Sequence, residues 1–203
     1  QSIYVLVQYM SQSLIEYLRS NWRTAGLTRD QFITMVPTQM RLGTMWYRGT
    51  ADAVRQNLNL VHDFDPDIVA VFGADHVYRM DIGQMIQWHV EAGADATVAT
   101  IPVPLKNAHS FGIVDADAKG RIVGFIEKPL QAKSMPGNPG HVLASMGNYL
   151  FNRDVLVDLL KNHYQGESDL DFGKNIIPDI VKSRKLSAYD FSTNQLPGLK
   201  LYE

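Results

Sequence analysis

The 203-residue sequence contains no cysteine, and this absence removes several kinds of chemistry at once. Disulfide bonds, thiolate zinc sites and cysteine nucleophiles are excluded, and the composition fits a reducing compartment. An excess of basic residues is also missing, because 19 lysines and arginines face 21 aspartates and glutamates. Since nucleic-acid binding needs a concentrated basic surface, we expect no nucleic-acid partner.

Long apolar runs are absent as well, although apolar residues make up 45% of the chain. None approaches the roughly 20 residues that a membrane-spanning helix needs. The first residues, Gln1 to Ile3, do not resemble a charged leader before a hydrophobic core. We therefore expect a cytoplasmic protein with no membrane partner, long enough for one sizeable globular domain.

The segment 67–78 organises the rest of the sequence. It begins with an unbroken run of β-branched and small apolar residues through Phe72, which is typical of a strand covered by helices on both faces. Gly73 and Ala74 end this run, and Asp75 follows at the carboxyl end of the strand. Ligands of open α/β sheets bind at that edge, so Asp75 is the first candidate for chemistry. An aspartate after a strand can also simply cap the next turn.

Apolar periodicity predicts strands that alternate with helices in the first half of the chain. Strands are expected at residues 3–7, 31–36, 67–72 and 96–103. Helices are expected from Ser11 to near Gly26, from Thr50 onward, and from Asp81 to Gly93. This order predicts an α/β fold in which a mostly parallel mixed sheet carries helices on both faces.

The second half of the sequence has a different pattern, richer in turns and in antiparallel features. The expected elements are a hairpin at 111–127, a strand at 142–151, a helix at 155–160, a helix within 169–182 and a strand at 186–191. Because proline disfavours helical angles in the preceding residue, we expect Lys128 to be extended before Pro129. Adjacent strand residues face opposite sides, so Glu127 and Lys128 can reach one ligand only through a local twist.

A loop delivers Tyr47, Arg48 and Gly49 to the amino terminus of the helix that begins at Thr50. Free N–H groups and the helix dipole make such a terminus favourable for an anion. Thr50 has the chemistry of an N-cap, and the same pattern is common in helices that bind nothing.

Six motifs occur in the same order as in one known family. They are WYRGTADA at 46–53, GADHVY at 73–78, FGIV at 111–114, EKP at 127–129, SMGNY at 145–149 and DFGK at 171–174. Each motif is modest alone, but the ordered set closely resembles the bacterial ADP-glucose pyrophosphorylases over almost the whole chain. The resemblance implies a Rossmann-like nucleotide-diphospho-sugar transferase fold. It also implies transfer of an adenylyl group from ATP to α-D-glucose 1-phosphate, with release of pyrophosphate, for glycogen synthesis.

The resemblance also implies roles for individual residues. Asp75 matches an aspartate that holds magnesium, so Mg²⁺ is the implied cofactor, and Lys128 matches a lysine that contacts the sugar phosphate; these two are the catalytic candidates. Two polyanions must meet in this reaction, and a hard cation offsets their repulsion without a general base. The positions that match sugar-phosphate contacts are Tyr47, Gly112, Glu127, Lys128, Ser145, Asp171 and Phe172. The positions that match contacts near the nucleotide are Gln39, Gly49 and Thr50.

Parts of the family pattern do not occur in these residues. The glycine-rich phosphate loop, the downstream segment with a second metal aspartate and the carboxyl-terminal β-helix domain are all missing. We therefore interpret residues 1–203 as an internal, partial catalytic domain and expect it to be inactive alone. For the full-length protein the resemblance implies an allosteric enzyme that forms a homotetramer.

Three alternatives remain open at this point. The first is a related sugar-1-phosphate nucleotidyltransferase with another nucleotide or sugar, because base choice depends on contacts near Gln39 and on the missing loop. The second is a non-catalytic regulatory subunit of the same fold, against which Asp75 and Lys128 count. The third is a sugar-phosphate binding module without a nucleotide, which the 47–53 loop disfavours.

Overall fold

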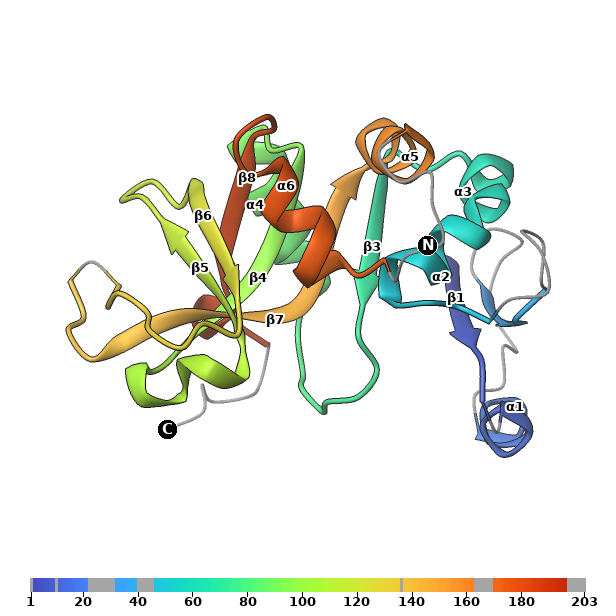
Figure 1. Cartoon of the computed structure of the whole chain (residues 1–203). Helices are drawn as coiled ribbons and strands as arrows, with labels where there is room; N and C mark the ends of the chain where they lie inside the picture. The colour runs from blue at the N-terminus through green and yellow to red at the C-terminus, as the bar shows by residue number, and fades with distance from the viewer. Residues whose placement is uncertain are drawn as a thin grey trace.

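The structure is a computed structural model that describes residues 2–9, 11–21, 32–39, 46–135, 137–162 and 170–196. Figure 1 shows two sheets, with the smaller one beyond the β3 edge of the larger one. The smaller sheet pairs β1 (Ser2–Val7) with β2 (Phe32–Pro37) in parallel, and α1 (Ser11–Asn21) connects toward β2. The expected end of this helix near Gly26 lies outside the described residues.

The larger sheet has six strands and is built around the longest of them, β7 (His141–Asn152). The first half of β7 pairs with β5 (Gly112–Ala116), and its second half pairs with β3 (Ile68–Phe72). Along its opposite edge β7 pairs with β4 (Ala96–Pro104). One reversed strand therefore joins the two halves of the chain.

Two further strands complete the larger sheet. β8 (Leu186–Asp190) lies parallel to β4, and β6 (Ile122–Glu127) forms the expected hairpin with β5. The α/β class with a mixed sheet is confirmed, but the expectation of mostly parallel pairing needs correction. Within the described residues, four strand pairs are antiparallel and two are parallel. The cause is β7, which lies between β4 on one side and β3 and β5 on the other. It runs antiparallel to all three of these strands.

Side chains of β7 alternate between two cores, as the twofold period of a strand requires. Tyr149 and Phe151 belong to the main core, whereas Leu150 belongs to a smaller core with Met85. The smaller core lies under α4 (Ile82–Ala92), which packs on β4 and β8. The main core lies under α5 (Arg153–Asn162) and α6 (Ile177–Ile180). Helices thus cover both faces of the sheet (Figure 1), as expected from its apolar strands.

Some helices differ in detail from the sequence prediction. The helix from Thr50 is interrupted at Asn57, which separates α2 (Thr50–Gln56) from α3 (Leu58–Phe64). The amide of Asn57 donates to Ala53 O at 2.8 Å and to the Tyr47 hydroxyl at 2.9 Å. Because a side chain bonded in this way competes with the helical ladder, the apolar stripe continues while the helix does not.

The expected helix within 169–182 consists of a π-turn, η2 (Phe172–Ile176), followed directly by α6. Two short 3₁₀ segments, η1 (Leu105–Ser110) and η3 (Phe191–Thr193), follow β4 and β8. Both ends of α4 are as expected: Asp81 Oδ1 accepts from Gly83 N at 2.8 Å, and Gly93 is left-handed with φ of 54°.

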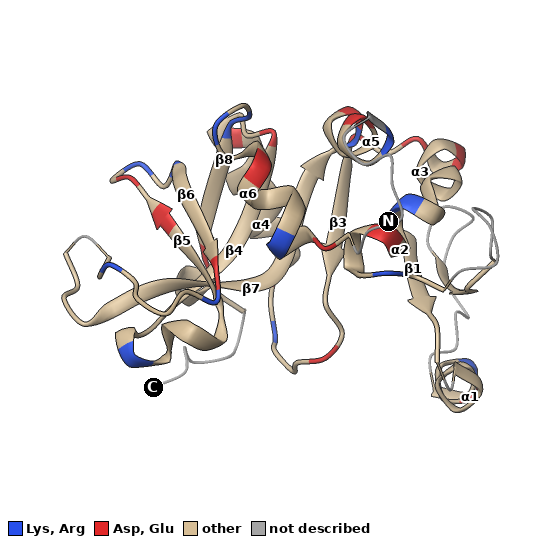
Figure 2. Cartoon of the chain, in the orientation of Figure 1, with Lys and Arg blue, Asp and Glu red and all other residues tan. Residues whose placement is uncertain are grey.

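Charged residues of both signs are spread over α5 and the β5–β6 turn, whereas residues 181–185 between α6 and β8 carry only basic ones (Figure 2). In the described part of the chain, no helix combines the length and apolar character needed to cross a membrane.

Candidate functional site

Residues from three distant segments meet around the hydroxyl end of Tyr149 on β7. This side chain is 7% exposed, and burial raises the pKa of its phenol to about 12. The negative charges of Asp171 and Glu127 raise this pKa further, whereas a hydrogen bond with Ser145 lowers it. Each effect requires proximity, so three predicted sugar-site residues share one neighbourhood.

Two glycines make room for the Glu127 carboxylate at the end of β6. A Cβ atom on Gly112 would lie 2.8 Å from Glu127 Oε2, and one on Gly173 would lie 3.1 Å from it. Gly112 is also the strand partner of Glu127 in the β5–β6 hairpin. A Cβ on Gly112 would also lie 2.5 Å from the Phe125 ring, so a side chain there would crowd both neighbours. The sugar-phosphate contact of Gly112 stays a prediction.

The Asp171 carboxylate is fixed from two sides. Its Oδ1 accepts from the N–H groups of Gly173 at 2.9 Å and Lys174 at 3.2 Å, so it caps η2. Its Oδ2 accepts from the Thr50 hydroxyl at 2.8 Å. Phe172 follows as a buried residue, 1% exposed, whose ring packs 5.5 Å from that of Tyr149. The structure gives Phe172 a supporting position beneath the cluster, and its contact with a sugar stays a prediction.

The amino terminus of α2 is occupied by another part of the same chain. Ala51 N and Asp52 N both donate to Leu170 O, at 3.0 Å and 3.1 Å. Gly49 has φ of 116°, and a Cβ there would lie only 2.4 Å from the same oxygen. These backbone amides are therefore already bonded, which corrects the expectation that they face an anion. The nucleotide contacts predicted for Gly49 and Thr50 remain predictions.

Asp75 lies in the loop after β3, with 94% of its side-chain surface exposed. A hydrogen bond from His76, 3.2 Å away, holds the pKa of this carboxyl below its usual range. A Cβ on Gly73 would lie 3.2 Å from Asp75 Oδ1 and 4.0 Å from Gly147 O. Asp75 is thus close to the bulged part of β7 at Gly147. Gly147 follows Ser145 by two residues, and its N–H donates to the Ser145 hydroxyl at 3.2 Å.

The residues around Asp75 can be tested for their fit to magnesium. Among the described residues, no three His, Cys, Asp or Glu side chains gather as a metal cluster. Mg²⁺ is commonly bound by only one or two carboxylates together with substrate phosphates and water. A single exposed, ionised carboxylate is consistent with that mode, so the prediction for Asp75 remains physically reasonable.

The Asp75 loop is connected to a buried amide on β7. The His76 ring stacks on Tyr78 with centroids 4.8 Å apart, and burial raises the pKa of the Tyr78 phenol. A hydrogen-bonding interaction with the Asn148 side chain lowers the pKa of Tyr78, so this side chain lies near the phenol. Asn148 is fully buried, yet neither its amide nitrogen nor its oxygen has a partner in good hydrogen-bond geometry.

Lys128 has a conformation that the sequence did not predict. Its φ is 46°, so it is left-handed and not extended before Pro129. Strand pairing ends at Glu127, and Lys128 N donates to Phe111 O at 3.0 Å. Because this turn ends the strict alternation of strand residues, Glu127 and Lys128 are not held to opposite faces of the sheet. A shared ligand for the two side chains stays a prediction.

Two predicted residues lie outside the cluster around Tyr149. The Tyr47 hydroxyl accepts from Asn57, while Tyr47 N donates to Gln8 Oε1 at 2.7 Å. Gln39 is exposed after β2, and its amide donates to Pro37 O at 3.0 Å. No contact in the described residues connects either side chain to Ser145, Glu127 or Asp171, so both assignments stay predictions.

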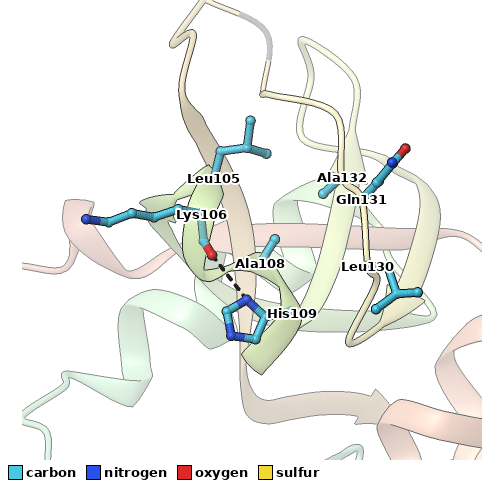
Figure 3. Close-up of a pocket in the computed structure, with 7 residues that line it drawn as sticks. All are labelled: Leu105, Lys106, Ala108, His109, Leu130, Gln131 and Ala132. Atoms are coloured by element: carbon cyan, nitrogen blue, oxygen red, sulfur yellow. Dashed lines mark hydrogen bonds between the residues drawn. The ribbon is translucent and has the colours of Figure 1, made fainter.

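A cavity of about 360 Å³ lies elsewhere, between η1 and the residues that follow Pro129. Figure 3 shows Leu105, Ala108 and His109 on one side of it and Leu130 on the other, with the Lys106 ammonium directed away. Its lining includes none of the predicted site residues. We place the candidate site around Ser145, Glu127 and Asp171, which are all partly exposed.

Sequence reasoning missed two residues of this region. Tyr149 ends the SMGNY motif at 145–149, but its apolar neighbours in the sequence are also typical of a core residue. Asp52 looked like an ordinary first-turn acid, whereas it is 3% exposed and accepts from Arg48 N and Gln56 Nε2. The only available signal was its position three residues after Gly49, within the conspicuous RGTAD sequence.

A mixed sheet with helices on both faces, and carboxylates gathered where strands end, is typical of α/β proteins that bind ligands at the edge of the sheet. A family model described as nucleotidyl transferase matches residues 1–195, and the chain belongs to this family.

The relatives carry a more particular name. Glucose-1-phosphate adenylyltransferase of Thermodesulfovibrio yellowstonii is 53% identical over 203 residues, which is all of this chain and 49% of that protein. The proteins of that name from Anaeromyxobacter sp. and Mycobacterium tuberculosis are 48% and 50% identical, over 96% and 97% of this chain and 47% and 48% of their own lengths. The chain thus spans about half the length of the curated relatives it matches.

Proposed function

We propose that the complete protein is a glucose-1-phosphate adenylyltransferase. It would convert ATP and α-D-glucose 1-phosphate to ADP-glucose and pyrophosphate for glycogen synthesis. The observation that carries this proposal is the pair of carboxylates at Gly173, where a Cβ would lie 3.1 Å from Glu127 Oε2 and 3.5 Å from Asp171 Oδ1, near Ser145 and Tyr149. Ionised carboxylates are pure hydrogen-bond acceptors, so two of them beside hydroxyl groups suit a ligand rich in hydroxyl donors, such as a sugar.

The proposed reaction is an in-line displacement at phosphorus. A phosphate oxygen of glucose 1-phosphate bonds to the α-phosphorus of ATP, while the bond from that phosphorus to the bridging oxygen breaks. The electron pair leaves with pyrophosphate, so no proton has to be removed and no general base is assigned. Positioning and charge stabilisation supply the rate enhancement.

The proposed roles follow from the chemistry of each residue. Lys128 acts as a point charge on the phosphate of glucose 1-phosphate. Glu127 and Asp171 accept from sugar hydroxyls, and Ser145 donates or accepts beside them. Asp75 would hold Mg²⁺, which when bound offsets the repulsion between the two polyanionic substrates. We also propose, on the resemblance alone, a cytoplasmic, allosterically regulated homotetramer.

The experiment measures pyrophosphate release by the complete gene product with Mg²⁺, glucose 1-phosphate and each nucleoside triphosphate in turn. We expect ATP to be preferred. Lys128→Gln should raise the KM for glucose 1-phosphate about ten-fold or more and the KM for ATP much less, because the lost charge faces only one substrate. Lys119→Gln, an exposed lysine of the β5–β6 turn, is the matched control and should change neither.

Asp75→Asn provides a second test, since it preserves size and removes the charge that would hold the metal. Turnover should fall about a hundred-fold or more, and Mn²⁺ binding, followed by its paramagnetic signal, should weaken. Preference for another nucleotide would support the related transferase. A protein that binds ADP-glucose without turning over would be the non-catalytic regulatory subunit.

A further inference from the structure

The hydroxyl of Thr50 joins two segments that lie 121 residues apart in the sequence. It donates to Asp171 Oδ2 at 2.8 Å and accepts from Phe172 N at 3.2 Å. A hydroxyl has one hydrogen to donate and lone pairs to accept, so both bonds form together. Thr50 therefore contacts Asp171 and Phe172, two of the residues that the family pattern places near the sugar.

This hydroxyl does not cap its own helix. The N-cap of α2 is Gly49, which has no side-chain cap, and Thr50 is already the first helical residue. The docking of α2 against Leu170 uses main-chain groups: Leu170 N donates to Arg48 O at 2.7 Å, and Leu170 O accepts from Ala51 and Asp52. These backbone bonds do not involve the Thr50 hydroxyl.

The two capping bonds of Asp171 hold only one of its carboxylate oxygens, and the Thr50 hydroxyl holds the other. Its Oδ1 is committed to Gly173 N and Lys174 N, whereas Thr50 is the only partner of Oδ2 in the described residues. The second side-chain torsion of aspartate is soft, so a carboxylate held through one oxygen keeps rotational freedom. The Thr50 bond restricts it, and Oδ2 retains a lone pair for another donor.

We propose that Thr50 is a positioning residue whose hydroxyl orients Asp171 Oδ2 toward a hydroxyl of the sugar phosphate. The family resemblance matches Thr50 to a contact near the nucleotide. The positioning role adds an effect of Thr50 on the binding of glucose 1-phosphate. Because α2 carries the Tyr47–Gly49 loop at its start, the same bond couples that loop to the sugar side of the site. The inference rests on the proposed function.

The first test compares Thr50→Val with Thr50→Ser in the complete gene product. Valine has nearly the shape of threonine without the hydroxyl, and serine restores the hydroxyl. We expect Thr50→Val to raise the KM for glucose 1-phosphate about ten-fold, the KM for ATP less than two-fold, and Thr50→Ser to recover most of the loss. Thr34→Val, at an exposed strand position in β2, is the matched control and should change neither.

The second test needs no activity and therefore separates this inference from the proposed function. A double-mutant cycle of Thr50→Val and Asp171→Ala in urea unfolding should show coupling of about five-fold or more in the unfolding equilibrium constant. If the wild type makes no ADP-glucose, the proposed function fails and the cycle still decides whether the bond exists. Absent coupling, or equal KM increases for both substrates without rescue by serine, would overturn the positioning role.

Discussion

At the residue scale, Asp52 is a buried carboxylate with hydrogen bonds from three residues. Burial raises its pKa, but hydrogen bonds from Arg48 N, the Gln56 amide and the Arg55 guanidinium outweigh burial, and the net pKa is lowered. The Arg55 pair is 2.9 Å apart, and only 4% of the Asp52 side chain is exposed. Asp52 therefore anchors the Tyr47–Gly49 loop from inside the protein.

We expect Asp52→Asn to cost about 1–3 kcal/mol of the free energy of unfolding at pH 7. A lowered folded-state pKa contributes stability that is present above the unfolded-state pKa and is lost as pH falls through the folded value. The difference between wild type and variant should therefore shrink below about pH 4. Urea unfolding across pH measures it. Asp63→Asn, an exposed position on α3, is the control and should show no such pH-dependent difference.

Asn148 is the opposite case, a buried polar group without well-formed hydrogen bonds. Its interaction with the Tyr78 phenol lowers the pKa of that phenol but is not a well-formed hydrogen bond, so most of the desolvation cost of the amide is not offset. We expect Asn148→Leu to leave the free energy of unfolding unchanged or to raise it by about 1 kcal/mol. Asn148→Asp should lower it by several kcal/mol, because it buries a charge. A loss with leucine as large as that with aspartate would show that the amide has a stabilising partner.

At this scale the sequence was informative about residue types and uninformative about their surroundings. Asp75, Glu127, Ser145 and Asp171 stand in motifs that the family resemblance identifies, and the structure brings the last three together. The left-handed turn at Lys128 and the burial of Asp52 could not be predicted. Both features depend on contacts with other segments of the chain, and the local sequence pattern does not predict those contacts.

At the scale of elements, the glycine before α2 and the glycine within β7 show different constraints. Gly49 has φ of 116° and lies against the backbone of Leu170, whereas Gly147 has φ of 71° with nothing within 4 Å of an added Cβ. Both positions strain any other residue, but only Gly49 would also collide with main-chain atoms that cannot move aside.

We expect Gly147→Ala to lower the free energy of unfolding by about 1 kcal/mol, through backbone strain alone. Gly49→Ala should cost at least about 3 kcal/mol, because the α2–Leu170 contact must open as well. Thermal and urea unfolding of the two variants provide the measurement. Similar losses for both would mean that the Leu170 backbone yields easily.

Most elements could be predicted from sequence because their signals are local. Asp81 and Gly93 mark the ends of α4, and the turn at Asp117 lies inside the predicted hairpin. The pairing of β7 could not be predicted, because which strand lies beside another is decided by contacts between distant segments. The break at Asn57 was also missed, since an asparagine within an apolar stripe is compatible with either one helix or two.

At the scale of the whole molecule, the two sheets differ in burial. Within β1 only Val7 is buried, whereas most of β4 and of the second half of β7 is buried. β7 has strand partners along both edges, but β1 and β2 have only each other in the described residues. Fewer buried contacts imply lower local stability.

Native-state hydrogen exchange should therefore separate the sheets. We expect amides of β4 and β7 to exchange at least about a hundred-fold more slowly than those of β1 and β2, because opening the smaller sheet exposes less buried surface. Mass spectrometry of peptides covering each strand gives the comparison. Equal protection would show that the two sheets open as one cooperative unit.

The placement of β7 also has a consequence for synthesis on the ribosome. In the described structure β3 pairs with no strand but β7, whose pairing residues are translated roughly 80 positions later. Until that segment leaves the exit tunnel, β3 exposes hydrogen-bonding groups that another nascent chain can bind. Slow codons before residue 141 would prolong this exposure, so the yield of soluble protein should depend on translation speed in that part of the message and on chaperones that shield it.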